Sequence, residues 1–89
     1  MEEKEPIVIE MYYTLSCPNC RVFKQLLKDV LPQFGNKFIL RMSLANSPRG
    51  MIKTMKLGIY AVPALLIDNQ IVFKSVPEKA QLIDILEKF

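Results

Sequence analysis

The chain has 89 residues, 51% of them hydrophobic and 24% charged, and its twelve Lys/Arg against nine Asp/Glu give a formal net charge of +3. This size suits a single domain, residues 1–89, with one core. The mild, scattered positive charge argues against nucleic-acid binding, and the lack of histidine excludes imidazole catalysis and a mixed Cys/His metal site supplied by one chain. The charged start MEEKEP and the absence of a long apolar run argue against a secretory signal or a membrane span, so we expect a cytoplasmic protein.

The first half of the chain predicts a strand, a helix, a second strand and a second helix. Residues 7–14, IVIEMYYT, are mostly β-branched or aromatic, as in a buried strand. From Pro18 the apolar residues follow the spacing of one helix face, namely Val22, Phe23, Leu26, Leu27, Val30, Leu31 and Phe34. Residues 37–44 again look like a strand, and Asn46-Ser47-Pro48 opens a helix that ends at Gly58.

The second half predicts a hairpin and a third helix. The apolar runs at residues 64–68 and 71–76 lie too close together for any connection but an antiparallel turn. After Pro77 the helical stripe consists of Leu82, Ile83, Ile85, Leu86 and Phe89. The order βαβαββα predicts an α/β fold with a mixed sheet covered by helices. The spacing of Met42, Met51 and Met55 favours core filling over a soft-metal site.

The stretch SCPNC, residues 16–20, holds both cysteines of the chain at the junction of the first strand and the first helix. Pro18 pushes Cys17 toward an extended backbone and itself suits the first helical position, so Cys17 is predicted as the N-cap. There its sulfur faces free backbone N–H groups, of Asn19 and Cys20, and the positive end of the helix dipole, which favour the thiolate. Cysteines in such positions have lowered pKa values. Cys17 is therefore the candidate nucleophile in disulfide exchange, and Cys20, one turn deeper, the candidate resolving cysteine.

Two other interpretations of the cysteine pair remain open. A zinc or iron–sulfur centre needs four ligands, so a non-catalytic module would have to share it across a dimer through both Cys17–Cys20 pairs. Two inert cysteines in a helix cap are the simplest alternative. We expect no metal and no cofactor beyond the redox-active disulfide itself, because Cys-x-x-Cys in a βαβ context is typical of redox enzymes.

With CPNC at residues 17–20 and LGIYAVPALLIDNQIVF at residues 57–73, the sequence resembles the thioredoxin and glutaredoxin family over almost its whole length, most closely the small, glutaredoxin-sized thioredoxins of prokaryotes and especially of archaea. The resemblance implies a thioredoxin-like fold, with four strands, the first two parallel, flanked by three helices. It also implies a cis peptide bond before Pro63, next to the cysteine pair. The backbone of Ala61 and Val62 would then pair with an extended stretch of substrate, and Tyr60 would shape the partner-binding surface.

Three departures from the family matter for function. Pro18-Asn19 between the cysteines is closer to glutaredoxins than to typical thioredoxins, and these two residues tune the redox potential in the family. The buried aspartate of typical thioredoxins falls on Met11. The neighbouring Glu10 is a candidate proton acceptor for Cys20, but a shift of one residue turns its side chain to the other face. We therefore expect Glu10 to pair with a lysine such as Lys37 or Lys74 or to reach solvent.

The predicted function is a protein-disulfide reductase, a thiol–disulfide oxidoreductase of thioredoxin type. Its partners would be protein disulfides and either a thioredoxin-reductase-like enzyme or a low-molecular-weight thiol, and we expect a monomer. A glutathione-dependent glutaredoxin is the alternative with the same chemistry, but residues 75–78, SVPE, replace the Gly-Gly and acidic pair of that group. Arg21 and Lys24 could hold a glutathione carboxylate or an acidic patch on a partner, although a solvated helix face is the simpler interpretation.

Overall fold

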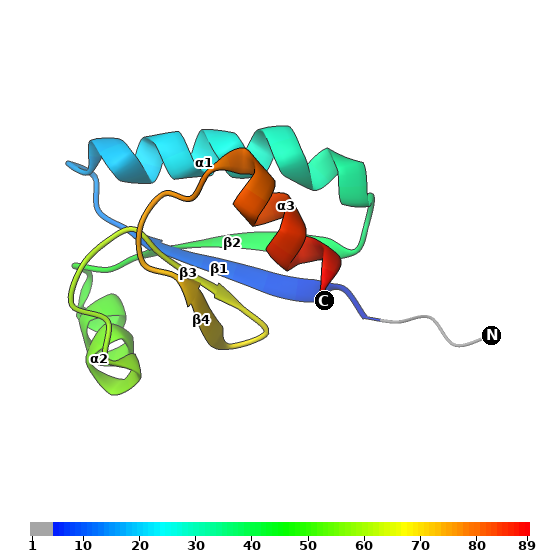
Figure 1. Ribbon diagram of the computed structural model, residues 1–89. Coiled ribbons are helices and arrows are strands. Elements are labelled where there is room, and N and C mark those ends of the chain that lie inside the picture. Colours follow the sequence, from blue (N-terminus) through cyan, green and yellow to red (C-terminus); the bar gives the residue numbers. More distant parts are fainter. Residues whose placement is uncertain (1–4) are drawn as a thin grey trace.

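The computed structural model describes residues 5–89, which form one four-stranded sheet with helices on both faces (Figure 1). The elements follow in the order β1 (Ile7–Tyr13), α1 (Pro18–Val30), the short 3-10 helix η1 (Leu31–Phe34), β2 (Phe38–Leu44), α2 (Pro48–Leu57), β3 (Ala64–Ile67), β4 (Gln70–Phe73) and α3 (Lys79–Glu87). The predicted α/β fold and its βαβαββα order are confirmed. Within the described residues, no helix combines the length and apolar character needed to cross a bilayer.

The strands lie in the order β2-β1-β3-β4, with β1 parallel to β2 and antiparallel to β3. Helix α1 is the crossover between the two parallel strands, as a parallel pair requires. The β3–β4 hairpin turns at Asp68 and Asn69, whose φ angles of 52° and 65° are left-handed. Asp and Asn tolerate that conformation better than other non-glycine residues. Strand β4 ends at Phe73, so the predicted extension to residue 76 is wrong.

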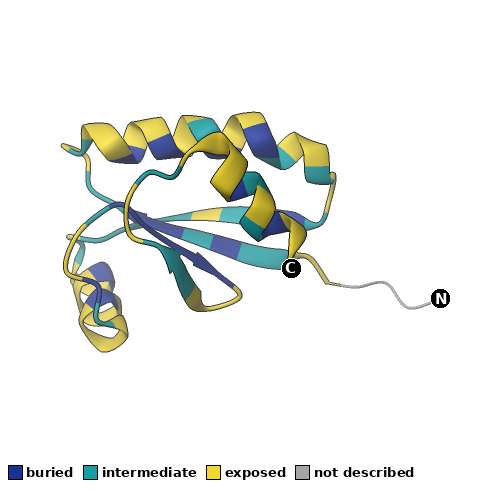
Figure 2. Cartoon of the chain, viewed as in Figure 1, coloured by how far each residue is buried: buried dark blue, intermediate teal, exposed yellow. Residues whose placement is uncertain are grey.

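Alternating residues of the strands build two cores, one on each face of the sheet. Ile9 and Met11 of β1 point to the face covered by α1 and α3, whose buried side chains are Cys20, Phe23, Leu27, Val30, Leu82 and Leu86. Tyr12 of β1 points to the other face and packs with Ile59, Ala64 and Leu66. Figure 2 shows the buried residues of α1 and α3 on the sides that face the sheet. The period of two along β1 thus determines which core each residue joins.

Two groups of residues predicted as core lie at the surface instead. Val22 of α1 is 56% exposed, because the buried side of the helix is centred on Phe23 and Leu27. Met51 and Met55 of α2 are 54% and 72% exposed. The buried residues of α2 are Gly50 and Thr54, so this helix turns its small residues toward the sheet and its methionines outward. Spacing alone predicted the helix but not which face would be buried.

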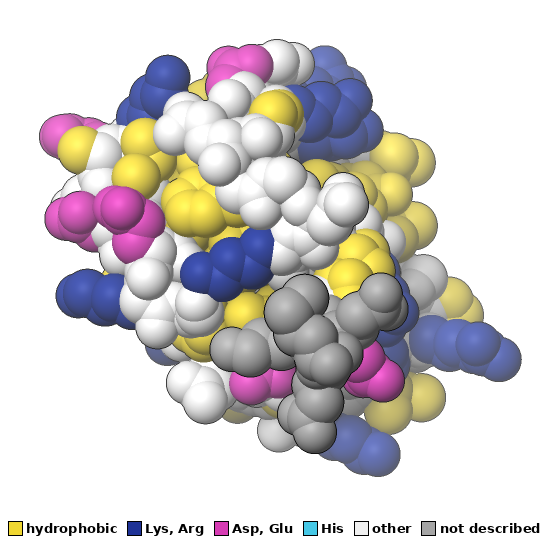
Figure 3. Space-filling view, turned by 90° about the vertical axis from the view of Figure 1, so that its right-hand side faces the viewer, with side chains coloured by type: hydrophobic (Ala, Val, Ile, Leu, Met, Phe, Trp, Pro, Cys, Tyr) yellow, Lys and Arg dark blue, Asp and Glu magenta, His cyan; other side chains and the backbone are white. Residues whose placement is uncertain are grey.

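The start of β1 and the end of α3 lie at the end of the molecule opposite the start of α1 (Figure 1). Figure 3 shows that basic and acidic side chains are interspersed on that face and do not gather into one patch of either sign. The cysteine pair lies at the other end of the molecule, where the loop after β1 leads into α1. The loop before β3 lies next to the start of α1.

Candidate active site at the Cys17–Cys20 pair

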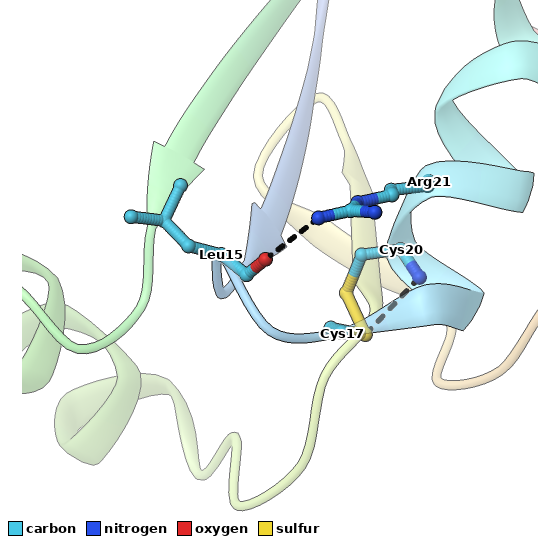
Figure 4. The surroundings of a disulfide bond; sticks show 4 residues. All are labelled: Leu15, Cys17, Cys20 and Arg21. Atoms are coloured by element: carbon cyan, nitrogen blue, oxygen red, sulfur yellow. Dashed lines mark hydrogen bonds between the residues drawn. A yellow bond between two sulfur atoms is a disulfide. The ribbon is translucent and has the colours of Figure 1, made fainter.

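Cys17 is the N-cap of α1, as predicted. Its φ and ψ of −101° and 103° are extended, and Pro18 follows in the first helical turn. The backbone N–H of Cys20 donates a 3.1 Å hydrogen bond to the Sγ of Cys17 (Figure 4). A charged sulfur accepts such a bond better than a neutral one, and the N-terminal end of a helix also favours negative charge. The local structure therefore stabilises a thiolate at Cys17.

Cys17 and Cys20 form a disulfide, with their Cα atoms 5.3 Å apart. Cys17 is partly exposed, whereas Cys20 is 3% exposed and belongs to the core that contains Met11 and Phe23. One sulfur is therefore within reach of a partner and the other is shielded by protein. This asymmetry is what attack by one cysteine and resolution by its neighbour require.

The Val62–Pro63 peptide bond is cis, as the family resemblance implied. Pro63 is buried, and Val62 packs against the same core cluster as Cys17. The residues before it are open to solvent, with Tyr60 90% exposed. A groove of about 280 Å³ lies along this loop, lined by Thr14, Ala45, Asn46, Met51, Thr54, Ile59, Tyr60, Ala61 and Val62. The structure thus brings the predicted substrate-binding residues together with Thr14, close to the cysteine pair, in a groove without a charged lining residue.

A second cavity, which we call the Cys20 pocket, lies on the other side of the β1–α1 loop. Its volume is about 270 Å³, and it is lined by Tyr13, Thr14, Leu15, Cys20, Arg21, Lys24 and Met42. Arg21 crosses its edge, since Nη2 donates to the carbonyl of Leu15 at 3.3 Å (Figure 4). The sequence places Arg21 and Lys24 near the site, and the structure shows that both line one cavity. Thr14, Leu15 and Met42 were missed, because nothing in their local pattern distinguishes them.

Glu10 does not face Cys20, and its predicted role as proton acceptor is wrong. Its side chain lies on the sheet face of Tyr12, where the Ser43 hydroxyl donates a 2.7 Å hydrogen bond to Oε2. The ion pair with Lys37 or Lys74 is not found within residues 5–89, but the alternative expectation holds in part, since Glu10 is half-buried and not enclosed. Its hydrogen-bond partner is Ser43. The physical reason is the strand period, because Met11, not Glu10, turns toward Cys20.

The buried side of Cys20 is apolar. Met11 is fully buried in the core cluster of Cys20 and lies in register with Met42 on β2. In residues 5–89 no three His, Cys, Asp or Glu side chains come together in a way that would hold a metal ion. The Cys17–Cys20 pair itself can form and break a disulfide reversibly.

Comparisons with known proteins agree with this geometry. A family model described as a thioredoxin domain matches residues 7–87. A thioredoxin of Methanocaldococcus jannaschii is 26% identical over 92% of this chain and 94% of its own length, and a probable thioredoxin of Archaeoglobus fulgidus is 25% identical over 92% and 88%. Among solved structures, a thioredoxin-2 of the malaria parasite aligns with a TM-score of 0.76 at 13% identity, over 99% of this chain and 87% of its own. A mutant thioredoxin from Halobacterium salinarum aligns with a TM-score of 0.77 at 16% identity, over 96% and 75%.

Proposed function

The chain belongs to the thioredoxin family and is a thiol–disulfide oxidoreductase, and on that premise we propose that it reduces disulfide bonds in protein partners. The observation that carries the proposal is the asymmetry of the cysteine pair. Cys17 is reachable and has a hydrogen-bonded sulfur at a helix N-terminus, whereas Cys20 is buried one turn behind it. Cys17 is the nucleophile and Cys20 the resolving residue.

The reaction takes place in two exchanges. The Cys17 thiolate attacks one sulfur of the partner's disulfide, which forms a mixed disulfide and releases the partner's other sulfur as a thiolate. The Cys20 thiolate then attacks Cys17 Sγ, which breaks the mixed disulfide and releases the second partner thiolate. The partner gains two electrons, and the Cys17–Cys20 disulfide carries the oxidised state. No further cofactor takes part in this cycle, which a reductase or a small thiol completes by reducing the pair again.

Substrate binding involves the loop before β3. The exposed Tyr60 and Ala61 and the half-buried Val62 line the uncharged groove that borders Thr14. An extended partner segment can pair with such a backbone strand to strand, which positions its disulfide with little dependence on side-chain identity. Pro18 and Asn19 complete the helix start, and Pro63 supports the loop from the core side. Residues 1–89 act as one domain and one monomer in this proposal.

The test is a redox titration combined with turnover. The protein is equilibrated in thiol/disulfide buffers of graded potential, free thiols are alkylated, and the Cys17–Cys20 midpoint is determined by intact mass. A midpoint near or below about −230 mV together with catalysed reduction of insulin disulfides supports a reductant suited to the cytoplasm. A midpoint above about −180 mV would make it an oxidant or isomerase. Absence of a two-electron transition, with zinc or visible absorbance in the purified protein, would replace redox catalysis by a metal-sharing dimer.

A further inference from the structure

The Cys20 pocket differs from the uncharged groove beside Tyr60 in its charge. The pocket is lined by two cationic side chains of α1, Arg21 and Lys24, and by no carboxylate. Tyr13 and Thr14 add two hydroxyl groups that can donate hydrogen bonds. The cavity therefore presents donors and positive charge next to a reacting sulfur.

Neither cation is neutralised by the rest of the described chain. Arg21 makes its hydrogen bond to the Leu15 carbonyl through one nitrogen, which leaves its other N–H groups free to bind a ligand. The carboxylate of Asp29, further along α1, instead accepts a 3.1 Å hydrogen bond from Gln25. An arginine fork beside a lysine is a suitable arrangement for holding a planar carboxylate.

We propose that the Cys20 pocket is a carboxylate subsite for the thiol or disulfide that exchanges with the cysteine pair. The inference rests on the proposed function, since it concerns the same two sulfurs. Arg21 and Lys24 hold the anion and Thr14 adds a hydrogen bond. Because the pocket reaches Cys20 and the Cα atoms of Cys17 and Cys20 are 5.3 Å apart, an anion bound there is close to the reacting disulfide.

The chemistry in the regenerating direction uses two equivalents of an anionic thiol. The first thiolate attacks Cys17 Sγ, breaks the Cys17–Cys20 bond and releases Cys20 as a thiolate. The second thiolate attacks the sulfur of the first in the mixed disulfide, and Cys17 leaves as a thiolate. The two thiols are oxidised to one disulfide and the protein pair gains the two electrons. The same subsite can instead receive an acidic side chain next to the cysteine of a protein partner.

The test for a free thiol compares three reagents of similar size and different charge: 3-mercaptopropionate, 2-mercaptoethanol and cysteamine. The rate of reduction of the oxidised protein is divided by the thiolate concentration of each reagent and by the reagent's rate constant with a small uncharged disulfide. The first division corrects for the ionised fraction and the second for the intrinsic nucleophilicity, which rises with the pKa of the thiol. We expect the anionic reagent to be the fastest. Arg21→Gln combined with Lys24→Gln should slow it about three- to tenfold and leave the neutral reagent nearly unchanged. Both side chains are exposed, so the variant keeps the fold.

The matched control is Lys53→Gln combined with Lys56→Gln, which removes the same net charge from α2 on the opposite face of the sheet. A loss of anion preference in this control as large as in the pocket variant would mean that overall charge is responsible, and would overturn the subsite. The second experimental arm uses peptide disulfides with Glu or Gln next to the cysteine. A preference for Glu that depends on Arg21 and Lys24 supports the subsite with a protein's acidic side chain as its ligand.

The two experimental arms distinguish a free thiol from an acidic protein partner as the ligand. They also distinguish failure of the subsite from failure of the proposed function. Anion preference among the small thiols supports a free thiol as the ligand, and preference among the peptides alone supports an acidic partner. Exchange without charge preference in either arm overturns the subsite and leaves the proposed function intact. A wild-type protein that exchanges with no thiol and no peptide disulfide refutes the proposed function, and the subsite with it.

Discussion

Glu10 and Met11 are consecutive residues of β1, and their side chains lie on opposite faces of the sheet. Met11 is fully buried in the core of Cys20, whereas Glu10 accepts a hydrogen bond from Ser43 on the α2 side. The position beneath Cys20 is therefore apolar, and the nearest carboxylate along the chain is separated from it by the sheet. Protons lost by Cys20 must leave by a route that does not involve Glu10.

Replacing Glu10 by Gln should leave disulfide exchange unchanged. The rate of resolution of a mixed disulfide at Cys17, measured from neutral to mildly alkaline pH, should have the same profile in Glu10→Gln and wild type. Asp29→Asn, which removes a carboxylate from the exposed side of α1, is the matched control. A shifted pH profile in Glu10→Gln alone would show that Glu10 communicates with Cys20 through the sheet.

The two cysteine variants should behave differently. Cys20→Ser should accumulate a stable mixed disulfide at Cys17, because the attacking thiolate is present and the resolving one is missing. Cys17→Ser should react slowly or not at all, because Cys20 is 3% exposed. Intact mass after incubation with a small aromatic disulfide distinguishes the two. Rapid formation of an adduct on Cys20 in Cys17→Ser would contradict the assigned order of attack.

Tyr60→Ala should affect substrate binding and not the fold. The side chain is 90% exposed, so we expect the free energy of unfolding to change by less than about 0.5 kcal/mol. The kcat/KM for insulin disulfides should fall several-fold, while reduction of a small aromatic disulfide stays nearly constant. Ile39→Ala, at an exposed position on β2, serves as the control. Equal losses with both substrates would argue against a role of Tyr60 in partner binding.

The Tyr12 hydroxyl is buried and has no hydrogen bond of regular geometry within residues 5–89. Burial, and then the nearby negative charge of Glu10, raise the pKa of Tyr12 above its ordinary value. Removing an unpartnered buried polar atom is favourable, so Tyr12→Phe should stabilise the protein by about 1 kcal/mol in urea denaturation. The carboxylate of Glu10 is close enough to contribute to the raised pKa as a hydrogen-bond acceptor. A loss of stability of that size would show that the hydroxyl has a partner, either Glu10 or water.

The same variant gives a pH dependence of defined sign. Above about pH 10 the unfolded wild-type chain ionises Tyr12 while the folded chain keeps it neutral, so the unfolded state binds fewer protons. Wild-type stability should therefore fall as the pH rises through this range. Tyr12→Phe should lose less stability over the same range, and parallel curves for the two proteins would contradict the raised pKa.

Gly50→Ala tests the close approach of α2 to the sheet. Alanine is usually favoured over glycine in a helix by about 1 kcal/mol. Here a Cβ at residue 50 would overlap the carbonyl oxygen of Leu44, which is backbone and cannot move aside. We expect a net destabilisation of about 1–3 kcal/mol in thermal or urea denaturation. Met51→Ala, at the next and exposed position, should be nearly neutral, and a neutral Gly50→Ala would mean that α2 moves freely.

Local signals in the sequence were sufficient to predict the helices and strands, the N-cap at Cys17 and the position of the hairpin. Each depends on neighbouring residues only: an X-Pro step, a period of two or 3.6, or a turn pair. The cis peptide bond before Pro63 was predicted from the family resemblance and not from a local signal. The exposure of Met51, Met55 and Val22 could not be predicted, because it depends on which side of a helix approaches the sheet. The Cys20 pocket combines residues of β1, β2 and α1, and no local pattern records that combination.

Helix α2 buries only Gly50 and Thr54, while Met51, Ile52 and Met55 lie at the surface. Little apolar area therefore holds it to the sheet, in contrast to α1 and α3, which share one continuous core. Segments with few buried apolar contacts open at the lowest free energy in native-state hydrogen exchange. The amides of α2 should accordingly exchange first and those of β1 and β3 last. A partner that binds to the exposed side of α2, formed by Met51, Ile52 and Met55, would therefore be detected as slower exchange of the α2 amides.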